Sequence, residues 1–413
     1  MSDVIVIGAG AAGMMCALCL LRKNRSVTLI EKNEKCGKKL FITGKGRCNI
    51  TNFSDVEEHL ANIQTNRKFM YSALYGFSAY DTVDFFNSLK LVTKVERGNR
   101  VFPGSDHSSD VIRALERGIR DEGGEILLNT TVSRILVNGG ENPKIKGVML
   151  SDGTKLFAER VIVATGGKSY PSTGSTGDGY KFAVSAGMEV TSLSPSLVPL
   201  NSGDKDILSL QGLSLRNVGA SFYRGKKKIY SGFGEMLFTH FGVSGPLILT
   251  ASASIPPSYF EKTEVLHIDL KSALSPEELD KRLIRVFEDN IHKEFKNSLG
   301  SLFPSKLIPV MISRSGIAPE KKCSGITREE RRAFLSLIKD LKVNISGLRG
   351  FEEAVVTKGG VSVKDLDPGS MESKKVKGLY FIGEVIDVDS LTGGFNLQIA
   401  WSTAHAAAEH IGV

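Results

Sequence analysis

Cysteine and tryptophan are scarce in this chain of 413 residues, which has five cysteines and one tryptophan. The odd set of Cys16, Cys19, Cys36, Cys48 and Cys323 argues against the disulfide framework of an exported protein, so we expect reduced thiols and a cytoplasmic location. Apolar residues at 41% and charged residues at 24% exclude a collagen, a disordered tail and a disulfide scaffold. The length gives room for roughly two to three domains.

A convincing signal segment or membrane span is also missing. Residues 4–21 carry no charge and could imitate one. Asp3, however, stands where a signal needs basic residues, no small-residue cleavage site precedes Arg22, and glycines interrupt the stretch. We therefore predict a strand, a turn and a helix here, and no membrane span.

Strong charge of one sign is absent as well. The 53 Lys and Arg residues against 45 Asp and Glu residues give a net charge of +8, which favours anionic ligands without requiring nucleic acid. Two short basic runs, 224–228 and 374–377, lie beside turn signals and lack interleaved aromatic residues. We interpret both runs as solvated loops and expect no nucleic-acid partner.

The residues that are present predict an α/β fold at the start of the chain. The β-branched run 3–7, the helix-favouring run 14–23 and the strand-like run 26–31 together form one βαβ unit. Helix and strand signals then continue to alternate, interrupted by a β-meander. The predicted elements are helices at 78–89 and 108–121, strands at 125–129 and 160–165, and meander strands at 131–137, 144–150 and 154–158.

A change of pattern predicts an inserted domain. Short Val, Leu and Phe strands and then charged helical stretches favour a β-barrel part at 191–270 and a helical part at 271–345. The last residues return to the first style, with a strand at 378–383 and an apolar helix at 396–411. We therefore predict that 1–190 and 346–413 form one domain.

Gly8, Gly10 and Gly13 form a Gly-x-Gly-x-x-Gly pattern between the first predicted strand and helix. The first glycine permits a tight turn, the second lets a pyrophosphate approach the backbone, and the third lets helix and sheet pack closely. The helix N-terminus offers free N–H groups to the phosphates. Glu31, at the end of the next strand, can accept from ribose hydroxyls, which favours FAD or NAD over NADP.

Two other glycine-containing segments lie at predicted strand ends. Segment 36–52 follows the Glu31 strand, so the topology carries its lysines and Arg47 over the ligand-binding edge of the sheet; the alternative is a solvated basic loop. Segment 390–396 opens the last helix. If that helix points its N-terminus at a flavin, its dipole would stabilise negative charge on the reduced ring. Asn396 is also predicted to cap the helix.

Three other chemistries are disfavoured. The run 166–169 resembles the end of a Walker A motif, but Ile162 occupies the place of the first glycine, so no P-loop forms. Cys36 and Cys48 lack the Cys-x-x-Cys spacing, and the pair at 16 and 19 lies in an apolar helix, which favours buried hydrophobes over a redox pair. The seven histidines show no metal-ligand spacing, so we expect no metal.

Several segments together resemble the bacterial FAD-binding flavoproteins of the aminoacetone oxidase and NADH-dependent bile-acid flavin oxidoreductase type. The resemblance implies an α/β fold: a Rossmann-like FAD-binding domain of glutathione-reductase type with a β-meander, split by an inserted domain with a β-barrel part and an α-helical part. It runs nearly end to end. The segments are 6–13, 43–52, 164–167 with Tyr170-Pro171, 239–246, and 383–389 with 392–398.

The resemblance also implies which residues bind FAD. Residues from the start of the chain would hold the adenosine diphosphate, the basic segment would line the cofactor, residues from the end would surround the flavin, and Val132 would contact adenine through its backbone. The implied set comprises Gly8, Gly10, Ala12, Gly13, Glu31, Lys32, Lys39, Thr43, Gly44, Arg47, Cys48, Asn49, Val132, Ala164, Thr165, Gly166, Gly383, Glu384, Gly394, Phe395, Asn396 and Leu397.

The function implied by the resemblance is an FAD-dependent oxidoreductase that passes hydride through flavin N5. NAD(P)H is the possible electron donor, and the acceptor is an unsaturated small molecule such as a bile-acid-like enone. An oxygen-using amine oxidase of the aminoacetone type is an alternative, and a tRNA-associated or noncatalytic flavin-binding protein is an alternative of another class. Tyr170, His240 and Asp387 could reach the substrate side, but each has an equally good structural explanation, so no catalytic acid or base is assigned.

Overall fold

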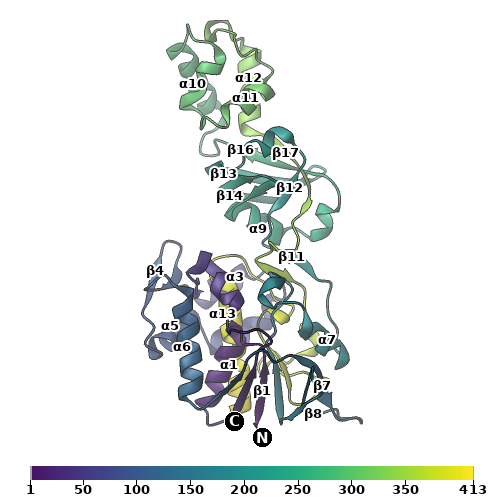
Figure 1. The fold of residues 1–413 in the computed structure, drawn as a ribbon. Coiled ribbons are helices and arrows are strands. Elements are labelled where there is room, and N and C mark those ends of the chain that lie inside the picture. Colours follow the sequence, from purple (N-terminus) through teal and green to yellow (C-terminus); the bar gives the residue numbers. More distant parts are fainter. Residues whose placement is uncertain (1, 413) are drawn as a thin grey trace. The chain divides into compact units, whose positions relative to one another are not determined.

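The computed structural model describes residues 2–412. The chain forms two compact units: unit 1 combines Met1–Ser196 with Phe351–Val413, and unit 2 is Leu197–Gly350. Figure 1 shows that purple and yellow segments, from the two ends of the chain, share unit 1. The expected Rossmann-like α/β class with a barrel is confirmed.

A five-stranded parallel sheet forms the centre of unit 1, in the order β19-β10-β1-β2-β6. The residues of β1 and β2 are buried throughout, because both faces of a parallel sheet are covered, and this explains their continuous apolar sequence. The strands are β1 (Val4–Ile7), β2 (Val27–Ile30), β6 (Glu125–Leu127), β10 (Arg160–Val163) and β19 (Leu379–Phe381).

Helices from both ends of the chain pack beside this sheet. The helix α1 (Ala11–Leu21) is buried at all but its first residue and contacts α6 (Ser108–Asp121) and α13 (Phe395–Gly412). Burial in the core thus explains why the first helix carries no charge. Within residues 2–412, no helix combines the length and apolar character that crossing a membrane requires.

The remaining elements of unit 1 surround this centre. The predicted meander is present as an antiparallel sheet whose middle strand contacts β10, and it lies on the side of β1 away from α6 in Figure 1. The meander strands are β7 (Val132–Val137), β8 (Ile145–Leu150) and β9 (Lys155–Phe157). The other elements are α2 (Lys38–Ile42), β3 (Thr51–Asn52), α3 (Val56–Asn62), α4 (Tyr71–Gly76), α5 (Ala79–Ser88), β4 (Thr93–Glu96), β5 (Arg100–Pro103), α7 (Asp178–Ser185), β11 (Ser194–Ser196) and β18 (Val356–Lys358).

A closed six-stranded barrel, in the order β12-β15-β14-β13-β16-β17, occupies part of unit 2. Its longest hairpin joins β13 (Ser214–Arg224) and β14 (Lys227–Thr239). Along β13 the side chains of Val218, Ala220 and Phe222 are buried, which is the alternation that a barrel wall requires. The other elements are β12 (Leu200–Ser202), α8 (Lys205–Leu208), β15 (Gly242–Ser244), α9 (Pro246–Ser254), β16 (Glu264–Asp269) and β17 (Leu341–Leu348).

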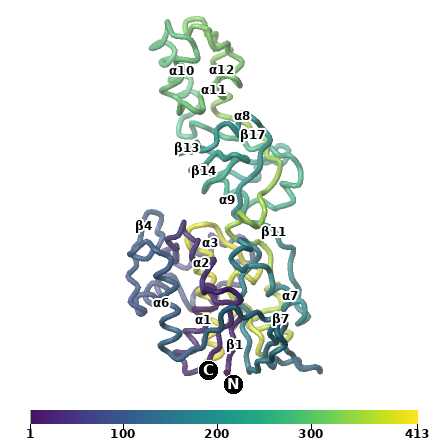
Figure 2. Tube along the Cα trace, in the orientation of Figure 1, coloured from purple at the N-terminus to yellow at the C-terminus, as the bar shows by residue number. Residues whose placement is uncertain are grey.

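Three helices complete unit 2: α10 (Pro276–Asp289), α11 (Ile308–Ser315) and α12 (Arg328–Lys339). Reciprocal capping boxes fix the starts of α10 and α12, because Ser275 and Thr327 each pair with the glutamate three residues later. The rings of Phe295 and Phe334 pack edge to face at 5.3 Å in the centre of this part. In Figure 2 the chain leaves α12 and returns to the barrel as β17.

The position of β17 corrects one sequence-based expectation. Residues 341–345 belong to the barrel and not to the helical part expected at 271–345. Leu341, Val343 and Ile345 are buried while the residues between them are exposed, which is the period of a strand.

Candidate cofactor site

Each of the three glycines in the first turn has a different structural environment. Gly8 has φ +102°, and an added Cβ would lie 2.6 Å from the carbonyl oxygen of Ala164. A Cβ on Gly13 would lie 1.9 Å from the carbonyl oxygen of Gly8, so helix and strand can meet only at a glycine. A Cβ on Gly10 would meet nothing within 4 Å. The turn therefore has open space at its second glycine, where a pyrophosphate is expected to approach.

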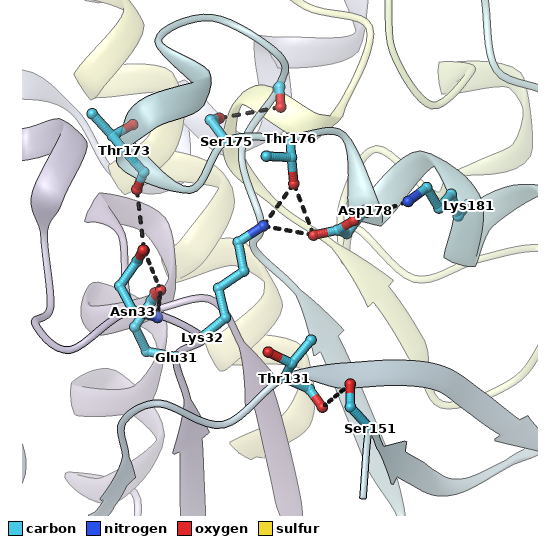
Figure 3. A network of polar contacts seen from close by, with 11 residues as sticks. Glu31, Lys32, Asn33, Thr131, Ser151, Thr173, Ser175, Thr176, Asp178 and Lys181 are labelled. Carbon is cyan, nitrogen blue, oxygen red and sulfur yellow. Dashed lines mark hydrogen bonds and ion pairs between the residues drawn. The ribbon is translucent and has the colours of Figure 1, made fainter.

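Polar contacts hold Glu31 at this turn, and Figure 3 shows its contact with Asn33. Its Oε2 accepts from the backbone N–H of Ala9 at 2.8 Å, and its Oε1 accepts from the backbone and side-chain amides of Asn33 at 2.9 and 2.7 Å. The Asn33 amide also donates to the carbonyl oxygen of Thr173 at 3.1 Å. These bonds fix the carboxylate beside the glycine turn, and Oε2, which accepts only one of them, retains a lone pair for a further donor.

Lys32 and Val132 lie in the same region. The Lys32 ammonium donates to Asp178 at 2.7 Å and to Thr176 at 2.6 Å, so it links the end of β2 to the start of α7 (Figure 3). Val132 is buried and pairs with Leu150 where the meander begins. Its predicted contact with adenine stays a prediction.

An ion pair ties the basic segment to the C-terminal part of the chain. The Lys39 ammonium donates to Glu384 Oε2 and to the hydroxyl of Ser169. The other Glu384 oxygen accepts from Ser169 at 2.7 Å and from the backbone N–H of Thr357 at 3.0 Å. Three other chain segments thus converge on the Glu384 carboxylate, whose charge is balanced by one ammonium.

Arg47 contacts two acidic residues, one on β4 and one just after β5. Its Nε donates to Asp106 at 2.7 Å, its Nη2 donates to Glu96, and its guanidinium lies 4.0 Å from the centre of the Phe102 ring. Hydrogen bonds from Lys94 and then Arg47 lower the pKa of Asp106, so this carboxylate is ionised at neutral pH. The predicted role of Arg47 in lining the cofactor stays a prediction, and these contacts fix its orientation.

The loop between α2 and β3 has an unusual backbone and an unpaired acceptor. Gly44, Lys45 and Cys48 have φ values of +57°, +60° and +58°, and a Cβ on Gly44 would lie 2.8 Å from the Asn49 nitrogen. The side-chain oxygens of Asn49 and Thr165 are buried and have no hydrogen-bond partner among residues 2–412. Buried polar atoms are normally satisfied, so both atoms fit hydrogen bonds to a polar ligand.

The C-terminal turn meets the N-terminal segments in the same unit. Gly383 has φ +73°, and a Cβ there would lie 2.9 Å from the Ala12 Cβ. Gly394 has φ +105°, and a Cβ there would lie 2.3 Å from the carbonyl carbon of Thr51. The structure therefore brings together the start and the end of the chain, as the expectation of a cofactor clasped between them requires.

Asn396 does not cap the last helix, so this prediction was wrong. The helix α13 begins at Phe395, which places Asn396 inside its first turn. The Asn396 side chain accepts from the N–H of Ser390 at 3.0 Å and donates to the carbonyl oxygens of Ser390 and Leu391 at 2.8 and 3.1 Å. The amide therefore fixes the preceding loop, because it can satisfy a donor and two acceptors there at once.

Burial alters the titratable groups near this turn. It raises the pKa of the Asp387 and Asp389 carboxyls above the ordinary value of 3.8. Burial also raises the pKa of the Cys48 thiol to about 12, so a redox-active thiolate is not favoured. Tyr170 lies in unit 1 with these groups, whereas His240 lies in unit 2. Within residues 2–412, no group of three or more His, Cys, Asp or Glu residues could hold a metal ion.

Two residues of the site escaped the sequence analysis. Ser169 joins Lys39 to Glu384, and the hydroxyl of Thr357 accepts from the backbone N–H groups of Lys168 and Ser169 at 2.7 and 3.1 Å. Ser169 belongs to the run 166–169, which does not form a P-loop and to which the sequence assigned no other role. Thr357 gives no local signal, because its partners lie almost 190 residues earlier in the chain.

The glycine turn, the anchored acidic residue and the unpaired Asn49 and Thr165 oxygens fit a dinucleotide, and they define a Rossmann-type nucleotide-binding protein. The family model described as "HI0933-like protein Rossmann domain" matches residues 2–410, and the chain belongs to this family. It is an FAD-binding oxidoreductase.

Relatives of known activity match the whole chain. The chain is 32% identical over 415 residues to a ribosomal RNA dihydrouridine synthase of Haemophilus influenzae, with 98% of each protein covered. It is 30% identical over 411 residues to a 3-dehydro-bile acid delta(4,6)-reductase of Clostridium scindens, again with 98% of each covered. The fold also resembles a 3-ketosteroid delta1-dehydrogenase of Sterolibacterium denitrificans, with a TM-score of 0.54 and 13% identity over 100% of this chain and 99% of that one.

Proposed function

We propose that this enzyme reduces a carbon–carbon double bond conjugated with a carbonyl group, with NAD(P)H as the electron donor. When bound, FAD supplies the hydride through its N5 atom. The observation that carries the proposal is the glycine turn, open at Gly10, in a chain that matches two reductive enzymes over nearly its full length. Forming dihydrouridine and reducing a bile acid that carries a 3-keto group both add hydrogen across such a double bond.

Different residues of unit 1 would hold different parts of the cofactor. We expect the turn at Gly8–Gly13 to bind the pyrophosphate and Glu31 to accept from the ribose hydroxyls. Lys39 would act through its charge, because its ammonium cancels the charge of Glu384, which would otherwise repel a diphosphate nearby. We further expect Asn49 and Thr165 to complete the polar contacts, because burial makes an unpaired oxygen costly.

Two substrate classes fit this chemistry. A bile-acid-like enone is the small-molecule candidate, supported by the similarity to the bile-acid reductase. Uridine in RNA is the second candidate, supported by the other relative and by the charge distribution. Unit 2 contains 23 Lys and Arg residues against 16 Asp and Glu residues, whereas unit 1 contains 30 against 29. Almost all of the positive surplus is therefore in the inserted unit, as a polyanionic substrate would favour.

The test is anaerobic reduction and reoxidation of the purified FAD-loaded protein. Stopped-flow absorption would follow flavin reduction by NADH, by NADPH and by a panel of small amines. The reduced protein would then be mixed with a 3-keto-4,6-diene bile acid or with uridine-containing RNA, and the products analysed by mass spectrometry. We expect a reduced nicotinamide to bleach the flavin, and one of the two acceptors to restore its colour and gain two hydrogens.

Each outcome selects among the candidates. Reduction by amines alone would refute the proposal in favour of the oxygen-using amine oxidase. Silence from every donor would favour a noncatalytic flavin-binding protein. Two variants are compared with the wild type. Gly10→Ala is expected to lose FAD. Gly139→Ala is its matched control, because an added Cβ at Gly139 would also meet nothing within 4 Å.

A further inference from the structure

We propose that the end of the β13–β14 hairpin is a docking surface for single-stranded RNA. The surface comprises Arg224, Lys226, Lys227 and Lys228 at the tip, with Tyr223 beside them and Phe233 further along β14. The inference rests on RNA as the substrate candidate of the proposed function and assigns the binding to particular residues of unit 2.

The cations at the tip are exposed and uncompensated. All four side chains are exposed, and none of them forms an ion pair among residues 2–412. Some other cations of unit 2 are neutralised locally: Arg331 pairs with Asp280 at 2.8 Å, and Lys339 pairs with Asp269 at 2.6 Å. The tip therefore gathers four cations where no paired carboxylate competes with a phosphate.

The hairpin presents these cations on a projecting ribbon. β13 pairs with β16 only at Gly219–Ser221, and β14 pairs with β15 only at Leu237–Thr239. Residues 222–230 therefore pair only across the hairpin. Gly225, with φ +59°, makes the tight turn, and Arg224 stands opposite Lys227. Both edges of the ribbon are thus free of neighbouring strands, so a nucleic-acid strand can lie along it.

Strand pairing also supplies the aromatic groups that the sequence run itself lacks. Tyr223 pairs with Lys228, and the Lys228 ammonium lies 5.7 Å from the centre of the Tyr223 ring. Phe233 pairs with Gly219 on this same outward face, and 63% of its surface is exposed. Ala220 and Phe222 on the opposite face are buried.

Cations beside an exposed aromatic ring are the arrangement that binds single-stranded nucleic acid. The cations follow the phosphates, and the ring stacks on a base. The solvated-loop interpretation of 224–228 rested on the absence of interleaved aromatics, but the hairpin pairs Tyr223 with Lys228 and presents Phe233 further along the same face. This juxtaposition favours RNA over a polyanion without bases.

The test compares RNA binding by the FAD-loaded full-length protein and by charge-matched variants. The triple variant Lys226→Gln, Lys227→Gln, Lys228→Gln removes three charges from the tip. The control variant Lys374→Gln, Lys375→Gln, Lys377→Gln removes three exposed charges from unit 1. Fluorescence anisotropy with a labelled uridine-rich single strand would be measured at several salt concentrations without NAD(P)H.

We expect the tip variant to bind at least about tenfold more weakly and its salt dependence to be shallower by about two in log–log slope, at about 0.7 for each lost phosphate contact. The unit 1 control should bind like the wild type. Phe233→Ala should weaken RNA binding at least about fivefold and leave heparin binding unchanged, because heparin has no bases to stack.

The inference is overturned if the tip variant binds RNA as the wild type does, or if both triple variants lose affinity equally. It is also overturned if the hairpin directs binding to anionic lipid vesicles and not to RNA. The proposed function is judged separately, because binding is measured without turnover. A wild type that binds RNA through the hairpin but reduces no uridine would keep the docking surface and refute RNA as the substrate.

Discussion

Alanine substitutions at Gly10 and Gly13 should separate cofactor binding from folding. Gly10 has φ −83° and ψ −166°, which alanine adopts without strain, and its added Cβ would meet nothing within 4 Å. We expect Gly10→Ala to stabilise the apoprotein by about 0.4–1 kcal/mol, because it reduces the entropy of the unfolded chain. The same methyl group would stand where the pyrophosphate approaches, so the Kd for FAD should rise at least about tenfold.

Gly13→Ala should have the opposite effect on the stability of the apoprotein. Its Cβ would lie 1.9 Å from the carbonyl oxygen of Gly8, so strand and helix must move apart. Overpacking of this kind costs about 1–3 kcal/mol or more in the free energy of unfolding, even without cofactor. Guanidinium denaturation of the apoproteins and fluorescence titration with FAD would measure both quantities, with Gly139→Ala as the control. An apo Gly13→Ala variant as stable as wild type, or a Gly10→Ala variant that binds FAD like wild type, would refute this assignment of roles.

Two further predictions concern buried titratable groups. Asp389 is 1% exposed, and burial raises its pKa above 3.8, so the native state loses stability as the pH rises through the folded pKa. Asp389→Asn should therefore gain stability over the wild type as the pH rises above the ordinary carboxyl pKa of 3.8 in urea denaturation, and a pH-independent difference would contradict this. All five cysteines are buried, and burial raises the pKa of Cys19 and Cys48 to about 12, so Ellman's reagent should label essentially none in the native protein and five after denaturation. Rapid labelling of the native protein would count against the packing described for α1 and for segment 36–52.

Local patterns predicted much of the fold. The helix expected at 108–121 forms over those residues, because its apolar spacing is periodic and two glycines follow it. Helix α5 begins after Ser78, whose capping box is visible in the sequence. The glycine turn between β1 and α1 also forms as expected. In each case the residues that determine the element lie within a few positions of it.

Long-range contacts could not be predicted in the same way. The ion pair of Lys39 with Glu384 joins residues 345 positions apart, and neither local sequence indicates which residue is its partner. Arg47 was expected near a cofactor, but which carboxylates orient it depends on how the β4–β5 hairpin folds back. Asn396 carries an N-cap residue type, yet its side chain bonds the preceding loop, because that loop offers a donor and two acceptors.

The closure of the barrel has a consequence for how such enzymes can diversify. Leu200, near the start of unit 2, pairs with Leu348, near its end, and β11 and β18 in unit 1 pair with each other just before and just after the unit. The chain thus departs and comes back along adjacent paths, so the whole module occupies the place of an ordinary surface loop. An insertion that leaves and returns at paired strands can change in length and sequence without reordering the strands of the parallel sheet, so unit 2 can vary while the fold of unit 1 stays the same.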